Sequence, residues 1–172
     1  MEKNQISLAG EFAVLSQLIL HGYDANLTLG NTKNVDILVS DSKSKKLFKI
    51  EVKTSFATKP IKSKIFGYCL AWIMTKKHEL IIDKNLYYCF VNIEKEKNKF
   101  RFFIVPSKIV AKYVHIQHQY WLENVFYKKG GLKEKDEKIN IRNFRIGLDD
   151  NENHYPIWTR LAKDFENNWR FK

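Results

Sequence analysis

The sequence is poor in residues on which several common classes of protein depend. It has 2 cysteines, 7 glycines and 3 prolines in 172 residues. The two cysteines, Cys69 and Cys89, are too few for a disulfide scaffold or a four-thiolate zinc site, and they favour a reducing, cytoplasmic setting. The glycines are scattered and form no phosphate-binding loop, and no serine or cysteine stands in a recognisable nucleophile motif. These absences argue against a disulfide-stabilised secreted protein, a P-loop protein and a serine or cysteine hydrolase.

Long hydrophobic runs are also missing. No apolar stretch approaches the roughly 20 residues that a membrane-spanning helix needs, and residues 1–5 lack the features of a signal peptide. Hydrophobic residues nevertheless make up 44% of the chain, enough for a packed core. The most linker-like segment is Gly130-Gly131 with the charged run 133–138. We therefore predict one main domain over 1–128 and a C-terminal extension, 129–172, that packs on it.

Acidic residues are scarce relative to basic ones, and the imbalance is local. The chain has 30 Lys+Arg against 19 Asp+Glu, a net charge of +11, which favours an anionic partner, nucleic acid first and a membrane surface second. Only five of the basic residues are arginine, and a lysine-rich composition can reflect an AT-rich genome. The window 43–78, however, holds ten lysines and a single acid, Glu51, whereas the rest of the chain is nearly neutral. Codon bias would spread lysine evenly, so this concentration points to a partner.

The hydrophobic pattern indicates a mixed α/β (α+β) fold that opens helix–strand–strand–strand. The first helix is expected to bury a stripe of Leu8, Phe12, Leu15 and Ile19. The second and third predicted strands are expected to form a hairpin over 35–54, and a second hairpin should span 86–105. Ser107 is the expected N-cap of a long helix. The predicted helices are 4–21, 75–82, 108–127 and 164–169; the predicted strands are 23–29, 35–39, 47–54, 86–93 and 100–105, with a lysine-rich connection at 55–64.

The strongest chemical signal is Glu51 followed two residues later by Lys53 on a predicted strand. Side chains alternate across a strand, so both project from the face opposite the apolar Ile50 and Val52. Two other acid-x-Lys sequences, at 41–43 and 136–138, lie in polar turn-like runs and are read as solvated charge. An exposed Glu-Lys pair on an amphipathic sheet is the alternative for the middle copy as well.

Asp36 strengthens the functional interpretation. It interrupts the apolar strand 35–39, where a carboxylate is costly unless it is paired, ligated or at an edge. If this strand pairs with 47–54, Asp36 lies beside Glu51, and two adjacent carboxylates favour a cation such as Mg²⁺ between them. Lys53 would then steady a phosphate or an attacking water. The alternative for Asp36 is an edge acid that meets a lysine of the hairpin.

Two further groups of residues are less decisive. Glu11 lies at the border of the apolar stripe of the first helix, where it can reach the rim of the sheet or face solvent. His115 and His118 are three residues apart on a predicted helix, but no third ligand at a recognisable spacing supports zinc. They are therefore interpreted as interfacial or surface histidines.

Taken in order, these residues resemble the PD-(D/E)xK nuclease superfamily. The resemblance covers residues 8–55 and is closest to archaeal Holliday-junction resolvases and small restriction-type endonucleases. The proline that usually precedes the first acid is replaced by Val35. The matching segments are Gly10-Glu11, His21-Gly22-Tyr23, Asn34-Val35-Asp36-Ile37 and Ile50-Glu51-Val52-Lys53.

The resemblance implies a restriction-endonuclease-like central mixed sheet flanked by helices, and Mg²⁺-dependent hydrolysis of DNA phosphodiester bonds. Asp36, Glu51 and the Val52 carbonyl would bind Mg²⁺, for which Mn²⁺ should substitute. Lys53 would orient or activate the water, and Glu11 would be an accessory ligand. A homodimer would suit cleavage of two strands. Restriction, homing, repair and junction-resolving roles all stay open.

The lysines near the predicted catalytic strand are the expected DNA contacts. The alternatives are a catalytically inactive nucleic-acid-binding protein that retains the nuclease fold, and an interaction protein with a lysine-rich surface. The predicted DNA-binding lysines are Lys33, Lys43, Lys45, Lys46, Lys59, Lys62 and Lys64.

Overall fold

The computed structural model describes residues 2–28, 35–42, 44–57, 59–136, 138–148 and 155–171. The chain divides into two compact units that interleave in sequence. The first unit comprises residues 1–59, 83–107 and 163–172, and the second comprises 60–82 and 108–162. The predicted boundary between 1–128 and 129–172 falls inside the second unit, and the division into a main domain and an extension that packs on it stays a prediction.

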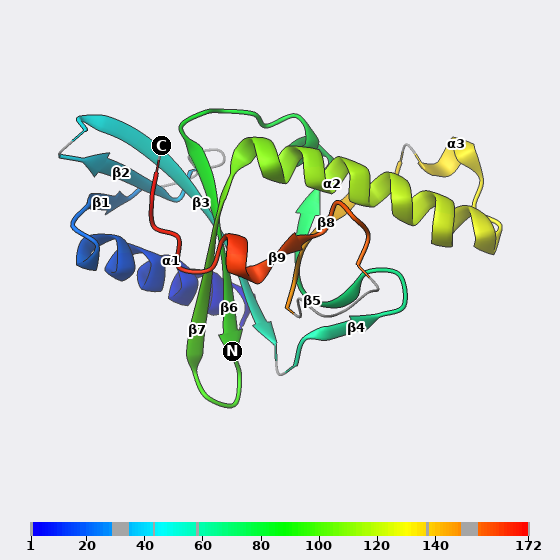
Figure 1. The fold of residues 1–172 in the computed structure, drawn as a ribbon, viewed down its shortest axis with the longest axis horizontal. Coiled ribbons are helices and arrows are strands. Elements are labelled where there is room, and N and C mark those ends of the chain that lie inside the picture. Colours follow the sequence, from blue (N-terminus) through cyan, green and yellow to red (C-terminus); the bar gives the residue numbers. More distant parts are fainter. Residues whose placement is uncertain are drawn as a thin grey trace. The chain divides into compact units, whose positions relative to one another are not determined.

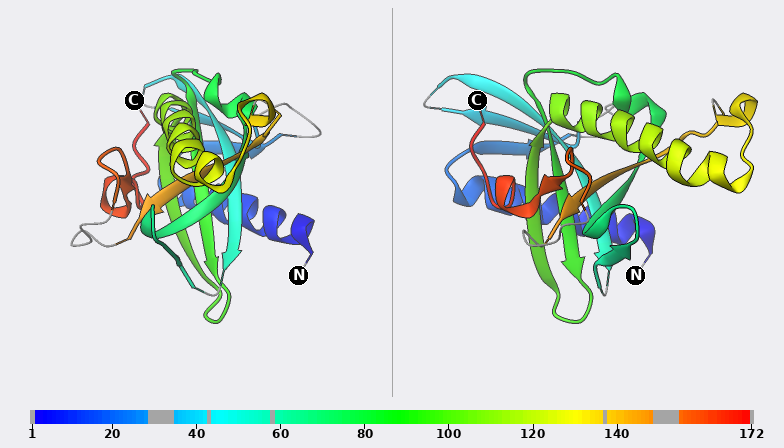
Figure 2. Two further views of the ribbon diagram at one scale, coloured as in Figure 1. Left: turned by 90° about the vertical axis from the view of Figure 1, so that its right-hand side faces the viewer. Right: turned by 45° about the vertical axis from the view of Figure 1, so that its right-hand side comes forward.

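A five-stranded mixed sheet forms the body of the first unit. Its strand order is β1-β2-β3-β6-β7, and every neighbouring pair is antiparallel except β3 and β6, which are parallel. Figures 1 and 2 show the helix α1 along this sheet and the long β6–β7 hairpin. The mixed fold and the helix–strand–strand–strand opening confirm the predicted fold class. The elements are α1 (Lys3–Leu20), β1 (Asp24–Leu27), β2 (Ile37–Asp41), β3 (Lys46–Ala57), β6 (Leu86–Glu94) and β7 (Lys99–Pro106).

Helix α1 packs on the sheet through a different face from the one predicted. Its buried residues are Gly10, Val14 and Leu18, spaced four apart, whereas Phe12 is 53% exposed. The reason is Gly10: a β-carbon there would lie 1.9 Å from the hydroxyl oxygen of Thr54 on β3, so only glycine permits this close approach. The helix therefore turns its glycine toward the sheet. Of the predicted stripe, Leu8, Phe12 and Ile19 are exposed, whereas Leu15 is partly buried against the core.

The last described residues complete the core of the first unit. The side chain of Trp169 is 4% exposed, and its carbonyl accepts a hydrogen bond from the Tyr23 hydroxyl at 2.8 Å. The Phe171 ring lies 5.3 Å from that of Phe48 and 5.0 Å from that of Tyr87, measured between ring centroids. The predicted helix at 164–169 is wrong, because only a 3-10 turn at Ala162–Asp164 forms here.

The second unit is built on a four-stranded sheet with helical segments. The strand order is β4-β5-β8-β9, with only β8 and β9 parallel. The predicted helix at 108–127 is present as α2 continued by a π-helical turn, and the predicted helix at 75–82 is a single 3-10 turn. The elements are β4 (Ile61–Ser63), β5 (Gly67–Thr75), the 3-10 turn Lys76–Glu79, α2 (Ser107–Trp121), the π-turn Leu122–Phe126, the 3-10 turn Tyr127–Lys129, α3 (Lys133–Asp136), β8 (Ile141–Gly147) and β9 (Arg160–Leu161).

Ser107 does not cap α2 as predicted, because the helix already includes it. Its hydroxyl instead donates to the Asp83 carbonyl at 2.7 Å and accepts from the Asp83 amide at 3.0 Å. Within the described ranges, no helix is long and apolar enough to cross a membrane.

Candidate active site

The pairing of β2 with β3 places Asp36 beside the middle of β3. Ile37 lies opposite Ile50, and the Asp36 amide donates to the Ile50 carbonyl at 2.8 Å. One residue before β2 begins, the Asp36 carboxylate accepts a hydrogen bond from the Val52 amide, with 2.6 Å between Oδ2 and N. A side chain thus takes the place that the next backbone group of β2 would have held. This bond fixes the carboxylate at the edge of β3 where the ladder ends.

Glu51 and Lys53 are paired on the same face of β3. Lys53 Nζ lies 2.5 Å from Glu51 Oε1, and the side chains are 30% and 4% exposed, respectively. The parallel register sets Glu51 next to Tyr88 of β6, and the two side chains interact electrostatically. Burial and this carboxylate raise the pKa of Tyr88, so the hydroxyl stays protonated. The Glu51 carboxylate is therefore paired with the Lys53 ammonium and lies beside a phenol that stays neutral.

The charges of these residues act on one another. Burial raises the pKa of Asp36 above its usual range, and the Glu11 and Glu51 carboxylates raise it further. The Val52 amide and the Lys53 ammonium oppose this shift. Three carboxylates with one ammonium among them form an excess of negative charge that a bound cation would relieve.

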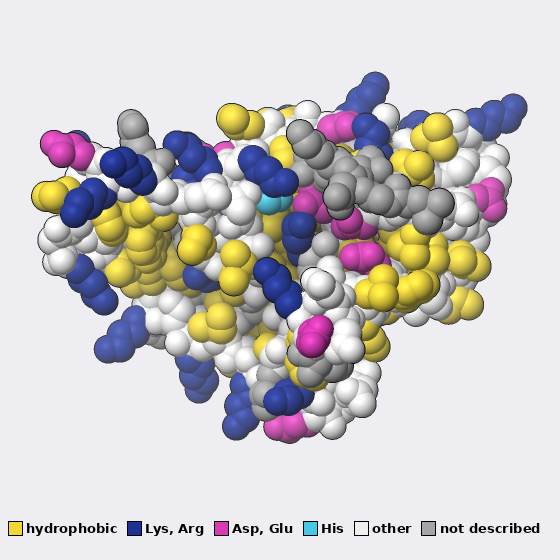
Figure 3. Space-filling view, turned by 180° about the vertical axis from the view of Figure 1, so that it is seen from behind, with side chains coloured by type: hydrophobic (Ala, Val, Ile, Leu, Met, Phe, Trp, Pro, Cys, Tyr) yellow, Lys and Arg dark blue, Asp and Glu magenta, His cyan; other side chains and the backbone are white. Residues whose placement is uncertain are grey.

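Glu11 comes to this site from α1 because of its neighbour Gly10. The close approach of Gly10 to Thr54 brings this turn of the helix against β3. Glu11 is half-buried, and its Oε1 accepts a hydrogen bond from the Ser7 hydroxyl at 3.2 Å. Acidic side chains gather near the middle of the face seen in Figure 3. The sequence analysis selected Glu11 because it borders a predicted apolar stripe that is mostly exposed. The feature that actually brings Glu11 to the site is the preceding residue, Gly10.

The donors at this edge fit a hard divalent cation. Asp36 and Glu51 supply carboxylate oxygens, and the Val52 carbonyl faces the same edge as the amide that binds Asp36, since both groups of a strand residue point to one side. No group of three or more His, Cys, Asp and Glu side chains in the described part of the chain is arranged to hold a metal ion. Two carboxylates suffice for Mg²⁺, which keeps several waters, but not for a fully protein-bound ion.

The fold is similar to that of a solved endonuclease. The structure is similar to that of a bacterial homing endonuclease, I-Ssp6803I, with a TM-score of 0.54 over 98% of this chain and 91% of that one. Sequence identity is 12%, so the likeness concerns the fold. No protein-family model matches the sequence, and no curated protein is significantly similar to it.

The predicted DNA-binding lysines are divided between the two units. Lys45, Lys46 and Lys59 are exposed on the first unit, and Lys62 and Lys64 are exposed on the second. Lys33 and Lys43 lie outside the described residues.

The prediction for the histidines is correct for His115 and wrong for His118. The His115 side chain is 56% exposed and lies 3.1 Å from Glu79 Oε2. His118 is 4% exposed and stacks on Trp121 with ring centroids 5.8 Å apart. Burial, with the nearby Arg142 charge, lowers its pKa to about 4, so this imidazole is neutral at pH 7.

Proposed function

We propose that this protein is a metal-dependent endonuclease of the PD-(D/E)xK type that hydrolyses DNA phosphodiester bonds. The observation that carries the proposal is the convergence of Asp36, Glu51 and Lys53 at one edge of β3, with Asp36 bound to the Val52 amide and Lys53 paired to Glu51. The similarity in fold to a homing endonuclease supports the endonuclease part of this proposal. So does the lysine-rich window 43–78, which includes this strand.

Asp36, Glu51 and the Val52 carbonyl would hold Mg²⁺, with Mn²⁺ as a substitute and Glu11 as an accessory ligand. When bound, the ion would supply a Lewis acid for a phosphate oxygen and lower the pKa of a coordinated water. The crowding of carboxylates that raises the pKa of Asp36 is the feature of this chain that such an ion would relieve.

Lys53 is the residue best placed to act on the substrate. Its side chain is 30% exposed, so the ammonium can reach a phosphate oxygen or hold a water without leaving the site. The ion pair with Glu51 limits its motion, and β3 is backed by the buried Ile50 and Val52. Groups fixed on a rigid, core-backed strand need little reorganisation as charge develops on the phosphate.

The test is cleavage of supercoiled, linear and branched DNA by the purified protein with Mg²⁺, Mn²⁺ or EDTA. We expect cleavage with either metal, none with EDTA, and none with Asp36→Asn or Lys53→Ala. Lys49→Ala is the matched control, because Lys49 lies two residues before Glu51 on the same strand but pairs with Asp83 at 2.9 Å. Cleavage that survives both site variants overturns the proposal.

Two other outcomes have defined meanings. DNA binding without cleavage under any metal condition would favour the inactive nucleic-acid-binding alternative. If the active form is a symmetric homodimer, one encounter should yield linear rather than nicked plasmid, and the ratio of these products measures this directly.

A further inference from the structure

A second site is suggested by a cavity of about 450 Å³ that lies wholly within the second unit. Its volume falls in the range of about 300–1,000 Å³ typical of ligand sites. Four cations line it, Lys64, Lys128, Lys129 and Arg145, and none of its described lining residues is acidic. Four positive charges around one hollow without a carboxylate call for an anionic ligand.

Arg145 of β8 is the most informative of these residues. Its Nε is buried and has no hydrogen-bond partner, and the described part of the chain provides no ion pair for it. Its guanidinium stacks on the Phe66 ring, with Cζ 4.1 Å from the ring centroid. With its amide oriented by its partners, Gln117 accepts a hydrogen bond from Nη1 at 2.9 Å. A largely desolvated cation with only neutral partners is costly unless an anion completes it.

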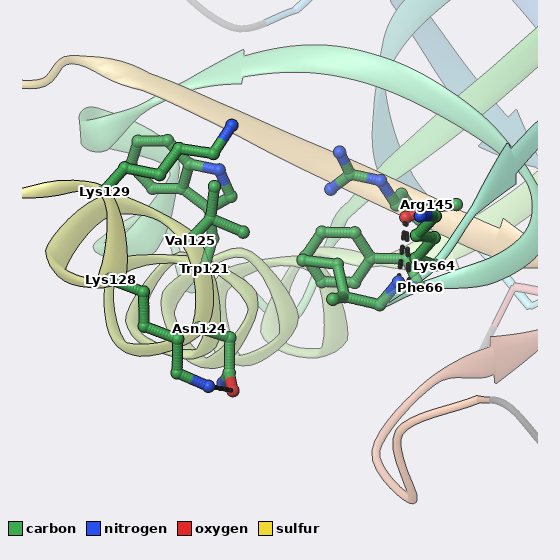
Figure 4. Close-up of a pocket in the computed structure, with 10 residues that line it drawn as sticks. Lys64, Phe66, Trp121, Asn124, Val125, Lys128, Lys129 and Arg145 are labelled. Atoms are coloured by element: carbon green, nitrogen blue, oxygen red, sulfur yellow. Dashed lines mark hydrogen bonds between the residues drawn. The ribbon is translucent and has the colours of Figure 1, made fainter.

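The lysines around the cavity come from separate elements. Lys128 and Lys129 follow the π-turn at the end of α2, where cations are favourable in any helix because of the dipole. The helix dipole does not explain the positions of Lys64 and Arg145. Lys64 lies between β4 and β5, and Arg145 lies on β8. Figure 4 shows Lys129 and Arg145 pointing into the pocket from opposite sides. Elements far apart in sequence therefore direct positive charge to one point.

Apart from the polar Ser63 and Asn124, the remaining lining is apolar and aromatic. Trp121 is half-buried, and with Val125 it also borders an adjoining cavity of about 530 Å³. One side of its ring system faces His118, and Ile65 and Phe66 lie on the other wall of the first cavity. Inorganic anions need no such surface, whereas a nucleobase gains about 1–3 kcal/mol from stacking on an aromatic side chain.

We propose that this cavity binds an unpaired nucleotide of a nucleic acid strand. The base lies on the apolar wall beside Trp121, and its phosphates contact Lys64, Lys129 and Arg145. A paired base cannot enter, because both of its faces are covered by its neighbours in the stack. The inference rests on the proposed function only in that the strand is DNA.

Binding is measured by fluorescence anisotropy in EDTA, which separates it from cleavage. The probes are a labelled duplex, the same duplex with one unpaired nucleotide, and a single strand of equal length. We expect wild-type protein to prefer the two probes with unpaired nucleotides. The double variant Lys64→Gln/Lys129→Gln should raise the Kd for these two probes about tenfold. It should also make the slope of log K against log salt concentration shallower by roughly 1.4 to 1.8, the change expected when two phosphate contacts are lost.

The matched control is Lys95→Gln/Lys99→Gln, which removes the same charge from exposed lysines of the first unit. The Kd of this control variant for the same probes should stay within about twofold of the wild-type value. Equal losses in the two double variants, or no preference for unpaired nucleotides in wild type, overturn the inference.

Photocrosslinking provides a readout that requires no variant. A 5-iodouracil placed at the unpaired position should crosslink to the peptide that contains Trp121, and the same base within the intact duplex should not. Crosslinks confined to other peptides overturn the inference. Its failure is distinct from that of the nuclease proposal. Cleavage without a preference for unpaired nucleotides in binding would remove only the inference, whereas cavity-dependent binding without cleavage would remove only the nuclease proposal.

Discussion

The two units of this protein hold their ionisable groups in opposite ways. In the first unit, three carboxylates gather around one lysine at the edge of β3. In the second, four cations surround a cavity whose described lining includes no acid. Each arrangement carries an excess of charge, and the excess has the opposite sign in each. The net charge of +11 does not reveal this difference, because a single sum cannot show two local excesses of opposite sign.

The two regions also differ in how firmly they position their groups. Asp36 is held by a backbone amide and Glu51 by an ion pair on a buried strand. Lys64, Lys128 and Lys129 are exposed on connections and helix ends. Bond breaking requires fixed geometry, whereas electrostatic attraction tolerates long flexible side chains. This contrast fits chemistry in the first unit and binding in the second.

The largest predicted effect separates chemistry from binding. Glu51→Gln should lower the cleavage rate about 100-fold to 10,000-fold, because it removes a proposed metal ligand and the partner of Lys53. The affinity for DNA in EDTA should stay within about twofold of wild type. If DNA affinity fell together with the cleavage rate, Glu51 would be needed for the folded structure as a whole. The proposed separation between chemistry in the first unit and binding in the second would then be wrong.

The second prediction concerns the contact that brings Glu11 to the site. Gly10→Ala should destabilise the protein by about 1–3 kcal/mol through overpacking against Thr54. Helix propensity alone would give the opposite sign, since alanine is favoured over glycine by about 1 kcal/mol. Urea unfolding measures the difference, with the exposed Ser16→Ala as the control on the same helix.

A double-mutant cycle tests the cause of that effect. Thr54→Ala removes the atom nearest to the new methyl group, so it should recover part of the loss caused by Gly10→Ala. Strictly additive effects would mean that the helix does not depend on this contact.

The third prediction uses the buried histidine of the second unit. The pKa of His118 is lowered to about 4 in the folded protein, whereas an unfolded histidine titrates near 6.5. Between these values the unfolded chain binds more protons, so stability should fall as the pH drops from about 6.5 to 4, by on the order of 1–2 kcal/mol. His118→Gln should flatten this dependence in urea titrations, whereas His115→Gln, at an exposed position, should leave it unchanged.

The smallest predicted effect is at Lys49. Its ion pair with Asp83 joins two exposed side chains, so Lys49→Ala should cost less than about 1 kcal/mol. Cleavage should change by less than about twofold. A loss similar to that of a Lys53 variant would mean that the site extends along β3 and is not confined to its middle.

Sequence reasoning could place Asp36, Glu51 and Lys53 together because their geometry is local. The alternation of side chains along a strand, together with the pairing of two strands in one hairpin, determines which side chains share an edge. Both features could be recognised in the sequence of residues 35–54. Tyr88 was not predicted, since its contact with Glu51 depends on a parallel pairing of strands that are distant in sequence. The direction in which α1 faces the sheet depends on a single glycine contact that no hydrophobic pattern encodes.

Strand β8 was missed for a different reason. Its inward positions include Arg142, which is 4% exposed and paired with Glu79. A charged residue at a buried position interrupts the alternation by which strands are recognised. The cavity lined by Arg145 was not predicted either, because that residue lies on the same unrecognised strand.

The first unit is discontinuous in sequence, and this has a consequence for its synthesis. Trp169 and Phe171 complete a core whose other members are made much earlier, up to Ser107. At about 5–20 residues per second, a ribosome needs roughly 3 to 11 s to travel from Ser107 to Lys163. During that interval the strands of the proposed catalytic unit are present without their last hydrophobic cover. The first unit is therefore completed only after residues 163–171 have been made, so the proposed capacity to cut DNA would appear only after that step.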